Sequence, residues 1–340
     1  MARSFRRGRR VSDPQRTDQQ RHSDPKPDPQ LAFVFPGQGS QSLGMLSELA
    51  QEHAIIAEVF AEASDGAGTD LWTLSQSGPD DRLNQTEFTQ PALLAAGVAT
   101  WRLWQARGGA TPARLAGHSL GEYSALVAAG VLGLADAARL VRLRGQLMQD
   151  AAPAGTGAMA AVLGADDALV QEVCEACSGR EVVVPANYNS PGQIVIGGHT
   201  AAVDKALTQL AERGVRKVVK LAVSVPSHTP LMRDAADRLA DAMATIQWKP
   251  AQLPVVQNVD ATVHDGSDAI RDALVRQLYL PVQWTGCVQA LRARGATRLA
   301  ECGPGKVLAG LVKRIDKSID ARAIGAPSDF DSAMQEWSAA

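Results

Sequence analysis

The chain has 340 residues, of which 45% are hydrophobic and 21% are charged, and its formal net charge is −2. This length and composition suffice for a large buried core and leave room for two domains. No stretch approaches the roughly 18 consecutive apolar residues of a membrane span, so we expect no membrane partner.

Residues 1–30 differ from the rest of the sequence, since they contain eight Lys and Arg, four Asp and almost no large apolar side chains. Such a segment cannot bury enough apolar surface to fold by itself. We expect a disordered basic extension, or a start codon placed too far upstream. The segment lacks the apolar region of a secretory signal, so we expect a cytoplasmic protein. This short basic run is weak support for nucleic-acid binding, and we expect none.

The first predicted strand covers Phe33–Phe35 and ends in the loop Pro36–Gly39, whose glycines permit close backbone approach. A glycine-containing loop after a strand can also hold a nucleotide. The sequence here matches neither the G-x-x-x-x-G-K-[ST] pattern nor G-x-G-x-x-G, so nucleotide binding is not predicted.

Gly117-His118-Ser119-Leu120-Gly121 is a G-x-S-x-G motif between a short apolar strand, 113–117, and an apolar helix that begins near residue 124. Small residues on both sides let the backbone turn sharply from strand to helix, which exposes the serine hydroxyl and frees the next amide N–H. The motif also arises by chance in unrelated proteins. Its strand–turn–helix context favours a nucleophilic serine.

A nucleophilic serine needs a base, and the sequence offers six histidines. His228 follows an apolar run over 217–225 that we expect to form a buried strand, so it would face a site from the strand's C-terminal end. A lone histidine is also common as a structural residue. The other five lie in polar or exposed segments or, for the one next to the serine, point away from it: His22, His53, His118, His199 and His264.

A carboxylate that would orient His228 is missing from the sequence between Ser119 and His228. The aspartates in this interval look like helix caps or exposed positions: Asp136, Asp166, Asp167 and Asp204. A plain lipase or esterase is therefore a poor fit, because its triad places an acid there. A Ser–His dyad oriented by another group fits better.

A second helix after the motif is predicted to begin with Asp136 as its N-cap and to carry Arg144. We expect Arg139 and Arg142 to project into solvent, and the same interpretation is open for Arg144.

Residues 157–225 show a strand, helix, strand, strand, helix, strand order, which is ferredoxin-like. The predicted strands are 157–163, 182–184, 193–197 and 217–225, with helices near 166–177 and 200–213. Cys174 and Cys177 form a C-x-x-C on the first helix, without the second pair that a zinc site needs. Two reduced thiols are expected there, with a redox role as the alternative.

Several motifs together resemble the bacterial malonyl-CoA:acyl carrier protein transacylases, from about residue 31 to about residue 327. The resemblance implies an α/β fold, with a hydrolase-like large domain on a mostly parallel sheet plus a small ferredoxin-like domain. The expected boundaries are 31–154 and 223–327 for the large domain, 155–222 for the small one, and 328–340 for a C-terminal tail. The motifs are FVFPGQGSQ at 33–41, TQPA at 89–92, GHSLGEY at 117–123, Arg144, NYNSPGQ at 187–193, VSVPSH at 223–228, PVQW at 281–284 and GPGK at 303–306.

The same resemblance implies roles for individual residues. The backbone amides of Gln38 and Leu120 would form the oxyanion hole, and an apolar residue at position 120 accompanies malonyl rather than methylmalonyl use. Arg144 would bind the malonyl carboxylate, and Asn189 would contribute to substrate binding. A backbone carbonyl at Gln277 would hold His228 in its working tautomer. No metal and no cofactor is implied.

The implied substrates are malonyl-CoA and acyl carrier protein, whose phosphopantetheine thiol receives the acyl group for fatty-acid synthesis. We expect a monomer with a basic patch for the acidic carrier, and candidates are Lys217, Lys220, Lys313, Arg314 and Lys317. The alternatives are the same chemistry on a carrier of a polyketide synthase or malonate decarboxylase, a serine thioesterase or hydrolase, and a non-catalytic carrier-binding scaffold.

Overall fold

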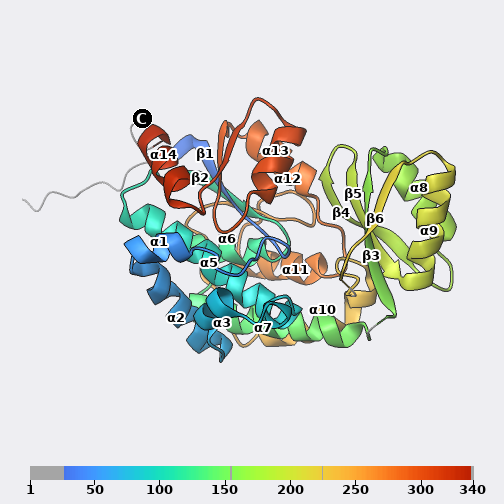
Figure 1. Ribbon diagram of the computed structural model, residues 1–340, viewed down its shortest axis with the longest axis horizontal. Coiled ribbons are helices and arrows are strands. Elements are labelled where there is room, and N and C mark those ends of the chain that lie inside the picture. The colour runs from blue at the N-terminus through green and yellow to red at the C-terminus, as the bar shows by residue number, and fades with distance from the viewer. Residues whose placement is uncertain (1–26, 154, 224, 338–340) are drawn as a thin grey trace, which may run out of the picture.

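A computed structural model describes residues 27–153, 155–223 and 225–337 (Figure 1). The expected basic extension lies mostly outside the described residues. Its last three residues, Asp28 to Gln30, belong to the first strand of the sheet. At the other end of the chain, the segment expected as a tail is mostly the helix α14, Pro327–Trp337, whose Phe330 and Trp337 are buried in the main core.

The large body is built on a five-stranded sheet, here called sheet A, in the order β7-β2-β1-β8-β9, and every neighbouring pair in it is parallel. The parallel arrangement brings the carboxyl ends of the strands to one edge, where sites of such sheets form. The strands are β1 Asp28–Phe35, β2 Pro112–Gly117, β7 Val255–Val256, β8 Arg298–Glu301 and β9 Asp320–Ala323.

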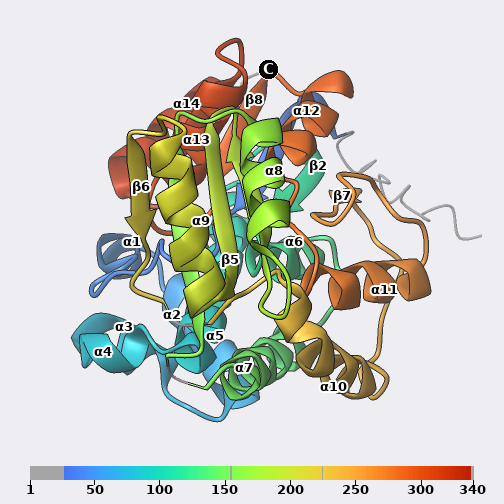
Figure 2. The same cartoon turned by 90° about the vertical axis from the view of Figure 1, so that its right-hand side faces the viewer.

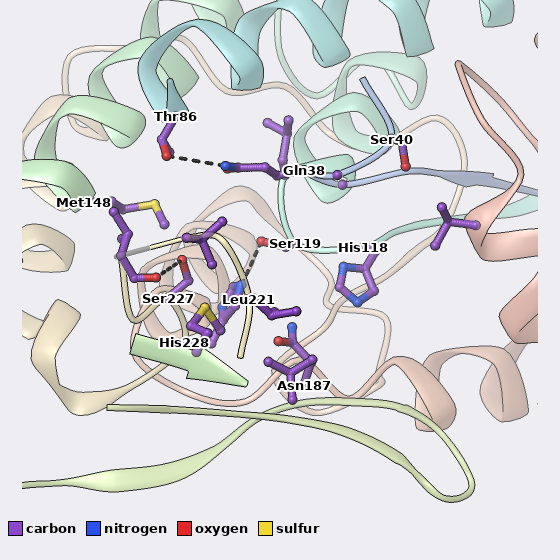
Figure 3. Close-up of a pocket in the computed structure, with 18 of the residues that line it drawn as sticks. Gln38, Ser40, Thr86, His118, Ser119, Met148, Asn187, Leu221, Ser227 and His228 are labelled. Atoms are coloured by element: carbon purple, nitrogen blue, oxygen red, sulfur yellow. Dashed lines mark hydrogen bonds between the residues drawn. The ribbon is translucent and has the colours of Figure 1, made fainter. Parts of the chain in front are cut away.

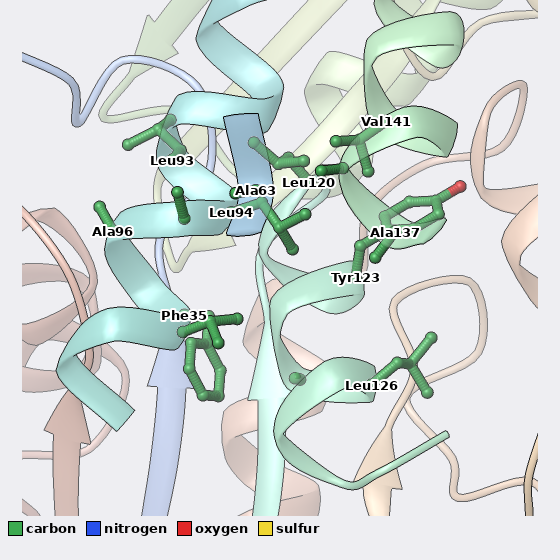
Figure 4. Close-up of a cluster of buried hydrophobic side chains, with 14 of the residues drawn as sticks. Phe35, Ala63, Leu93, Leu94, Ala96, Leu120, Tyr123, Leu126, Ala137 and Val141 are labelled. Atoms are coloured by element: carbon green, nitrogen blue, oxygen red, sulfur yellow. The ribbon is translucent and has the colours of Figure 1, made fainter. Parts of the chain in front are cut away.

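Strand β1 shows why both faces of sheet A are covered. Leu31, Phe33 and Phe35 point into one hydrophobic core, and Ala32 and Val34 point into another. All five are at most 1% exposed, as expected for a parallel strand with helices on both sides. Figure 4 shows part of the first core, with Phe35 at the end of β1 and Tyr123 in the helix that follows the G-x-S-x-G turn.

Helices cover the two faces of sheet A in Figures 1 and 2. The helices of the large body are α1 Ser47–Glu52, α2 Ile55–Ala67, α3 Leu71–Ser77, α4 Asp80–Leu83, α5 Thr86–Ala106, α6 Gly121–Ala128, α7 Leu134–Ala151, α10 Arg233–Met243 after a short 3-10 turn at Pro230–Met232, α11 Ser267–Gln277, α12 Trp284–Ala293, α13 Val307–Ile315 and α14.

The small body is a four-stranded antiparallel sheet, sheet B, in the order β4-β5-β3-β6. This order and the alternation of strands and helices confirm the predicted ferredoxin-like arrangement. Figure 2 shows α8 and α9 on its outer face. The elements are β3 Gly157–Leu163, α8 Asp167–Cys177, β4 Val183–Ser190, β5 Gln193–His199, α9 Thr200–Glu212 and β6 Lys217–Lys220.

Backbone hydrogen bonds join the two bodies beside the site. The N–H of Val282, just before α12, donates to Ala186 of β4 at 2.9 Å, and the N–H of Tyr188 donates to the carbonyl of Val282 at 2.9 Å. Across residues 27–153, 155–223 and 225–337, no helix combines the length and the apolar character needed to cross a membrane.

Candidate active site

Ser119 lies at the turn between β2 and α6, where the sequence predicted a strand–turn–helix. Its φ of 51° is in the left-handed region, which is uncommon for a residue with a side chain and is the strain expected at a nucleophile elbow. Glycine is required on both sides of the turn, because a side chain at either position would overlap neighbouring backbone atoms. A Cβ on Gly117 would lie 1.9 Å from the carbonyl carbon of Gly121, and one on Gly121 would lie 2.0 Å from the carbonyl oxygen of Phe35.

His228 is the histidine that the structure brings to the serine. Ser119 Oγ and His228 Nε2 are 2.8 Å apart, and Figure 3 shows the two side chains pointing toward each other. The predicted strand over 217–225 is wrong in its second half, because β6 ends at Lys220. His228 is held instead in a left-handed conformation, with φ of 62°, and its N–H donates to the carbonyl of Leu278 at 2.9 Å.

The end of helix α11 supplies the group that orients the histidine. Gln277 is the last residue of α11, where carbonyl groups lack partners within the helix. Its carbonyl oxygen lies 2.7 Å from His228 Nδ1. Because a carbonyl only accepts, Nδ1 carries the proton and Nε2 is free to take one from Ser119. The negative end of the helix dipole favours the cationic imidazole that results.

Burial keeps His228 neutral before reaction. Burial, reinforced by the nearby charge of Arg144, lowers the pKa of His228 from 6.5 to about 3. The imidazole is therefore unprotonated near neutral pH and can act as a base.

Two backbone amides border the same cavity as the serine. Gln38 follows β1, and Leu120 precedes α6, and both line the cavity. Within the described residues, neither N–H donates to another protein atom. Leu120 also stands at the positive end of α6. The pair is therefore available to stabilise an oxyanion, as the resemblance implied. The Gln38 side chain turns aside toward Thr86, with 3.5 Å between Nε2 and Oγ1 (Figure 3).

Arg144 lies inside the site, so the alternative of an exposed residue on α7 is wrong. It is 1% exposed. Nη1 donates to Gln90 Oε1 at 2.8 Å, and Nη2 donates to Gln277 Oε1 at 3.1 Å and to Ser119 Oγ at 3.3 Å. Within the described chain no carboxylate lies within ion-pair distance of its guanidinium. A buried cation held by neutral amides beside a nucleophile can receive an anionic substrate group.

Two other expectations for α7 are wrong. Arg142 does not extend into solvent, because it donates to the carbonyl of Ala67 at 2.5 Å and lies over the ring of Phe88. Asp136 is not the N-cap, since the helix begins at Leu134. Asp136 sits in the first turn and pairs with Arg139, which is exposed as expected.

His118 and Asn189 form a second polar pair at the cavity. His118 Nε2 lies 2.8 Å from Asn189 Oδ1 on β4, so this histidine is directed away from the Ser119 hydroxyl, as predicted. Burial lowers the pKa of His118, which keeps this imidazole neutral as well. Asn189 therefore lies at the cavity wall, where a substrate contact is possible.

Sequence reasoning missed the polar side chains beneath the elbow. Asn258 follows β7 and accepts from the Ser119 N–H at 2.7 Å through Oδ1, while its Nδ2 donates to the Gly117 carbonyl at 2.6 Å. Glu122, the fully buried residue after the motif, contacts Asn258 and Gln277. One sequence signal could have indicated this network. Two amide side chains, Gln257 and Asn258, directly follow a short buried strand, at the edge of the sheet where parallel strands end.

The site opens into a cavity of ≈ 450 Å³ between the two bodies. Met159, Val195 and Leu221 come from the inner side of the small body and form an apolar wall. Val223 and Val307 also line the cavity and are 38% and 50% exposed. An acyl thioester carries both apolar and polar groups, and this mixed lining suits it.

The competing chemistries gain no support from the described residues. No group of three or more His, Cys, Asp and Glu side chains there is arranged to hold a metal ion. Cys174 and Cys177 are buried thiols in the core of the small body, and burial raises the pKa of Cys174 to about 12. The Cys174 thiol therefore stays protonated and poorly reactive.

Comparison with known proteins agrees with this site. A family model described as the acyl transferase domain matches residues 32–326. The chain belongs to this acyl transferase family. It is 54% identical over 306 residues to the malonyl CoA-acyl carrier protein transacylase of Escherichia coli strain K12, which covers 90% of this chain and 99% of that protein. The predicted membership is therefore confirmed.

Solved structures confirm the predicted fold class. The malonyl-CoA:acyl carrier protein transacylase of Xanthomonas oryzae pv. oryzae superposes with a TM-score of 0.91 at 72% identity, over 92% of this chain and 100% of that one. A malonyl-transacylase solved with its type II polyketide acyl carrier protein gives a TM-score of 0.89 at 50% identity, over 90% and 99% of the two chains.

Proposed function

We propose that this acyl transferase moves the malonyl group from malonyl-CoA to the phosphopantetheine thiol of an acyl carrier protein, and so supplies fatty-acid synthesis. One observation carries the proposal. Ser119 Oγ lies 2.8 Å from His228 Nε2 and 3.3 Å from Nη2 of the buried Arg144. A hydrolase of neutral esters has no need for a buried cation beside its nucleophile, whereas a malonyl thioester carries a free carboxylate.

In the first half-reaction His228 Nε2 takes the proton of the Ser119 hydroxyl as Oγ attacks the thioester carbonyl. The amides of Gln38 and Leu120 stabilise the tetrahedral oxyanion. The C–S bond then breaks, and CoA leaves with the proton from His228. Arg144 binds the malonyl carboxylate, whose carbon is three bonds from Oγ in the resulting ester. This arrangement fixes the acyl group against the elbow.

In the second half-reaction the carrier thiol gives its proton to His228 while its sulfur attacks the malonyl-serine ester. The C–O bond to Ser119 breaks, and Oγ recovers the proton. One imidazole therefore serves both directions, which requires a base that returns to the neutral state after each transfer. The pantetheine arm would run along the apolar wall of the cavity, which also reduces access of water to the ester.

The carrier would dock over the cavity mouth, where the exposed Val223, between β6 and the 3-10 turn, and Val307, the first residue of α13, line the cavity. Two of the basic candidates already have partners, since Lys220 pairs with Asp204 and Arg314 donates to Gln193. We further propose that the enzyme works as a monomer in the cytoplasm without a cofactor, with Asn189 as a substrate contact.

The test is intact-mass measurement after mixing with malonyl-CoA. The protein should gain one malonyl group, Ser119→Ala should gain none, and a holo acyl carrier protein should remove the group from the enzyme and carry it. An adduct on Ser119→Ala would refute the assignment of the nucleophile. Release of free malonate at the same rate with and without carrier would show a hydrolase instead. Fatty-acid and polyketide carriers tested in parallel identify the pathway.

A further inference from the structure

Glu122 is a buried acid that the reaction described above does not use. It is 0% exposed and lies in the first turn of α6, three residues after Ser119. Its carboxylate accepts three hydrogen bonds. Oε2 accepts from the backbone N–H of Asn258 at 2.8 Å and from Gln277 Nε2 at 3.1 Å, and Oε1 accepts from Gln257 Nε2 at 3.1 Å.

Two of these three partners, Asn258 and Gln277, form hydrogen bonds with residues of the active site. Asn258 accepts from the Ser119 N–H at 2.7 Å. Gln277 Nε2 also donates to the Ser119 carbonyl at 3.0 Å, while its Oε1 accepts from Arg144 and its backbone oxygen faces His228. Asn258 and Gln277 therefore connect the Glu122 carboxylate to Ser119. Gln277 also connects it to His228 and Arg144.

We propose that Glu122 is a positioning residue for acyl transfer: acting through Asn258 and Gln277, it fixes the strained Ser119 turn against His228. This inference rests on the proposed function, since it concerns the same serine and histidine. Glu122 does not reach the substrate. Its contribution is to hold two neutral amides in the orientation that the reaction needs.

The chemistry of the three donors explains why an acid is present. An ionised carboxylate only accepts, so it satisfies all three donors at once, whereas an amide would present an N–H to at least one of them. Burying a carboxylate is costly unless it is fully bonded. The three hydrogen bonds and the positive charge of Arg144 offset only part of that cost, so the pKa of Glu122 stays above its ordinary value. The other ionisable groups that face Glu122 are Tyr123 and Cys287.

The first test replaces the acid without changing its shape. Glu122→Gln should lower the rate of Ser119 acylation by about 10²-fold, the usual cost of misplacing a reacting group by about 1 Å. The loss should be similar for malonyl-CoA and acetyl-CoA, since both use the same nucleophile and base. Glu301→Gln is the matched control, because Glu301 is equally buried but accepts from the backbone of α13 at Leu308 and Ala309. It should lose stability and keep its acylation rate.

The pH profile supplies a readout that a purely structural role would not move. Burial raises the pKa of Glu122 to about 7, whereas His228 stays neutral well below that pH. Protonation of Glu122 removes one acceptor from the network. Acylation by the unaltered protein should therefore rise with pH through about 7, and this rise should be absent in Glu122→Gln. An identical rise in the variant would overturn the role of Glu122.

A folded Glu122→Gln that acylates at the original rate would refute the inference. If that variant does not fold, Gln277→Ala breaks the same link while retaining the backbone carbonyl beside His228, and an original acylation rate there would refute it equally. Glu122→Gln combined with Asn258→Ala should lose less than the product of the two single losses, because both act on one network. Failure of the unaltered protein to form malonyl-serine would refute the proposed function instead.

Discussion

Replacing Arg144 by alanine should change which acyl group the enzyme prefers. The guanidinium is held by the neutral amides of Gln90 and Gln277, so its charge remains available for a substrate carboxylate. A hydrogen bond to a charged group contributes about 1.5–3 kcal/mol. Each 1.36 kcal/mol is about tenfold in rate, so kcat/KM for malonyl-CoA should fall by roughly 10-fold to 160-fold.

Acetyl-CoA should lose much less in Arg144→Ala, because a neutral acyl group offers the buried cation no carboxylate in the unaltered protein. The malonyl-to-acetyl ratio of kcat/KM should therefore collapse. Arg139→Ala is the control, since Arg139 is on the same helix, is 64% exposed and pairs with Asp136. Arg142 would be a poor control because it packs against the protein. Equal losses for both donors in Arg144→Ala would mean that Arg144 supports the fold and does not bind the carboxylate.

Three further predictions concern the base, the elbow and pH. His228→Ala should slow acylation and transfer by about 10²–10⁴-fold in rapid-mixing measurements, and a near-original rate would make His228 structural. Gly121→Ala should lower the thermal unfolding midpoint and abolish the adduct, because its Cβ would lie 2.0 Å from the Phe35 carbonyl oxygen. Gly310→Ala, at an exposed position of α13 with open space around it, should instead stabilise, and the reverse pattern would contradict the contact argument. Between the folded pKa of about 3 and the ordinary 6.5 of His228, the unfolded chain binds a proton that the folded chain does not, so the free energy of unfolding should decrease as pH falls through this window. His228→Ala should show a smaller decrease, and an unchanged one would assign the effect to other groups.

Local patterns predicted the elements that carry their own signals. The strand before Ser119 and the ferredoxin-like order of the small body could be predicted from apolar runs and the turn residues between them. The strand predicted before His228 is wrong beyond Lys220, because an apolar run can line a cavity as an irregular chain as well as form a strand. Val223 is in that run and lines the cavity outside any strand.

The network beneath the elbow could not be predicted for a different reason. Asn258 and Gln277 are far from Ser119 in sequence, and their value depends on which donor meets which acceptor in the folded chain. Arg144 illustrates the same limit, since an arginine on an amphipathic helix gives no local sign of whether it turns inward. The resemblance to the family predicted that the Arg144 side chain turns inward, whereas the periodicity of the helix did not.

The Ser119–Gln277 contact spans 158 positions along the chain, which has a consequence for synthesis. A growing chain that has just passed residue 228 already contains the serine, the histidine and Arg144. It still lacks the carbonyl that sets the histidine tautomer and the amide that braces the serine turn. Competence to react with acyl-CoA therefore arises late, after synthesis has passed Gln277 at about four-fifths of the 340-residue chain. Unfinished chains and fragments cut before Gln277 cannot consume the acyl-CoA pool.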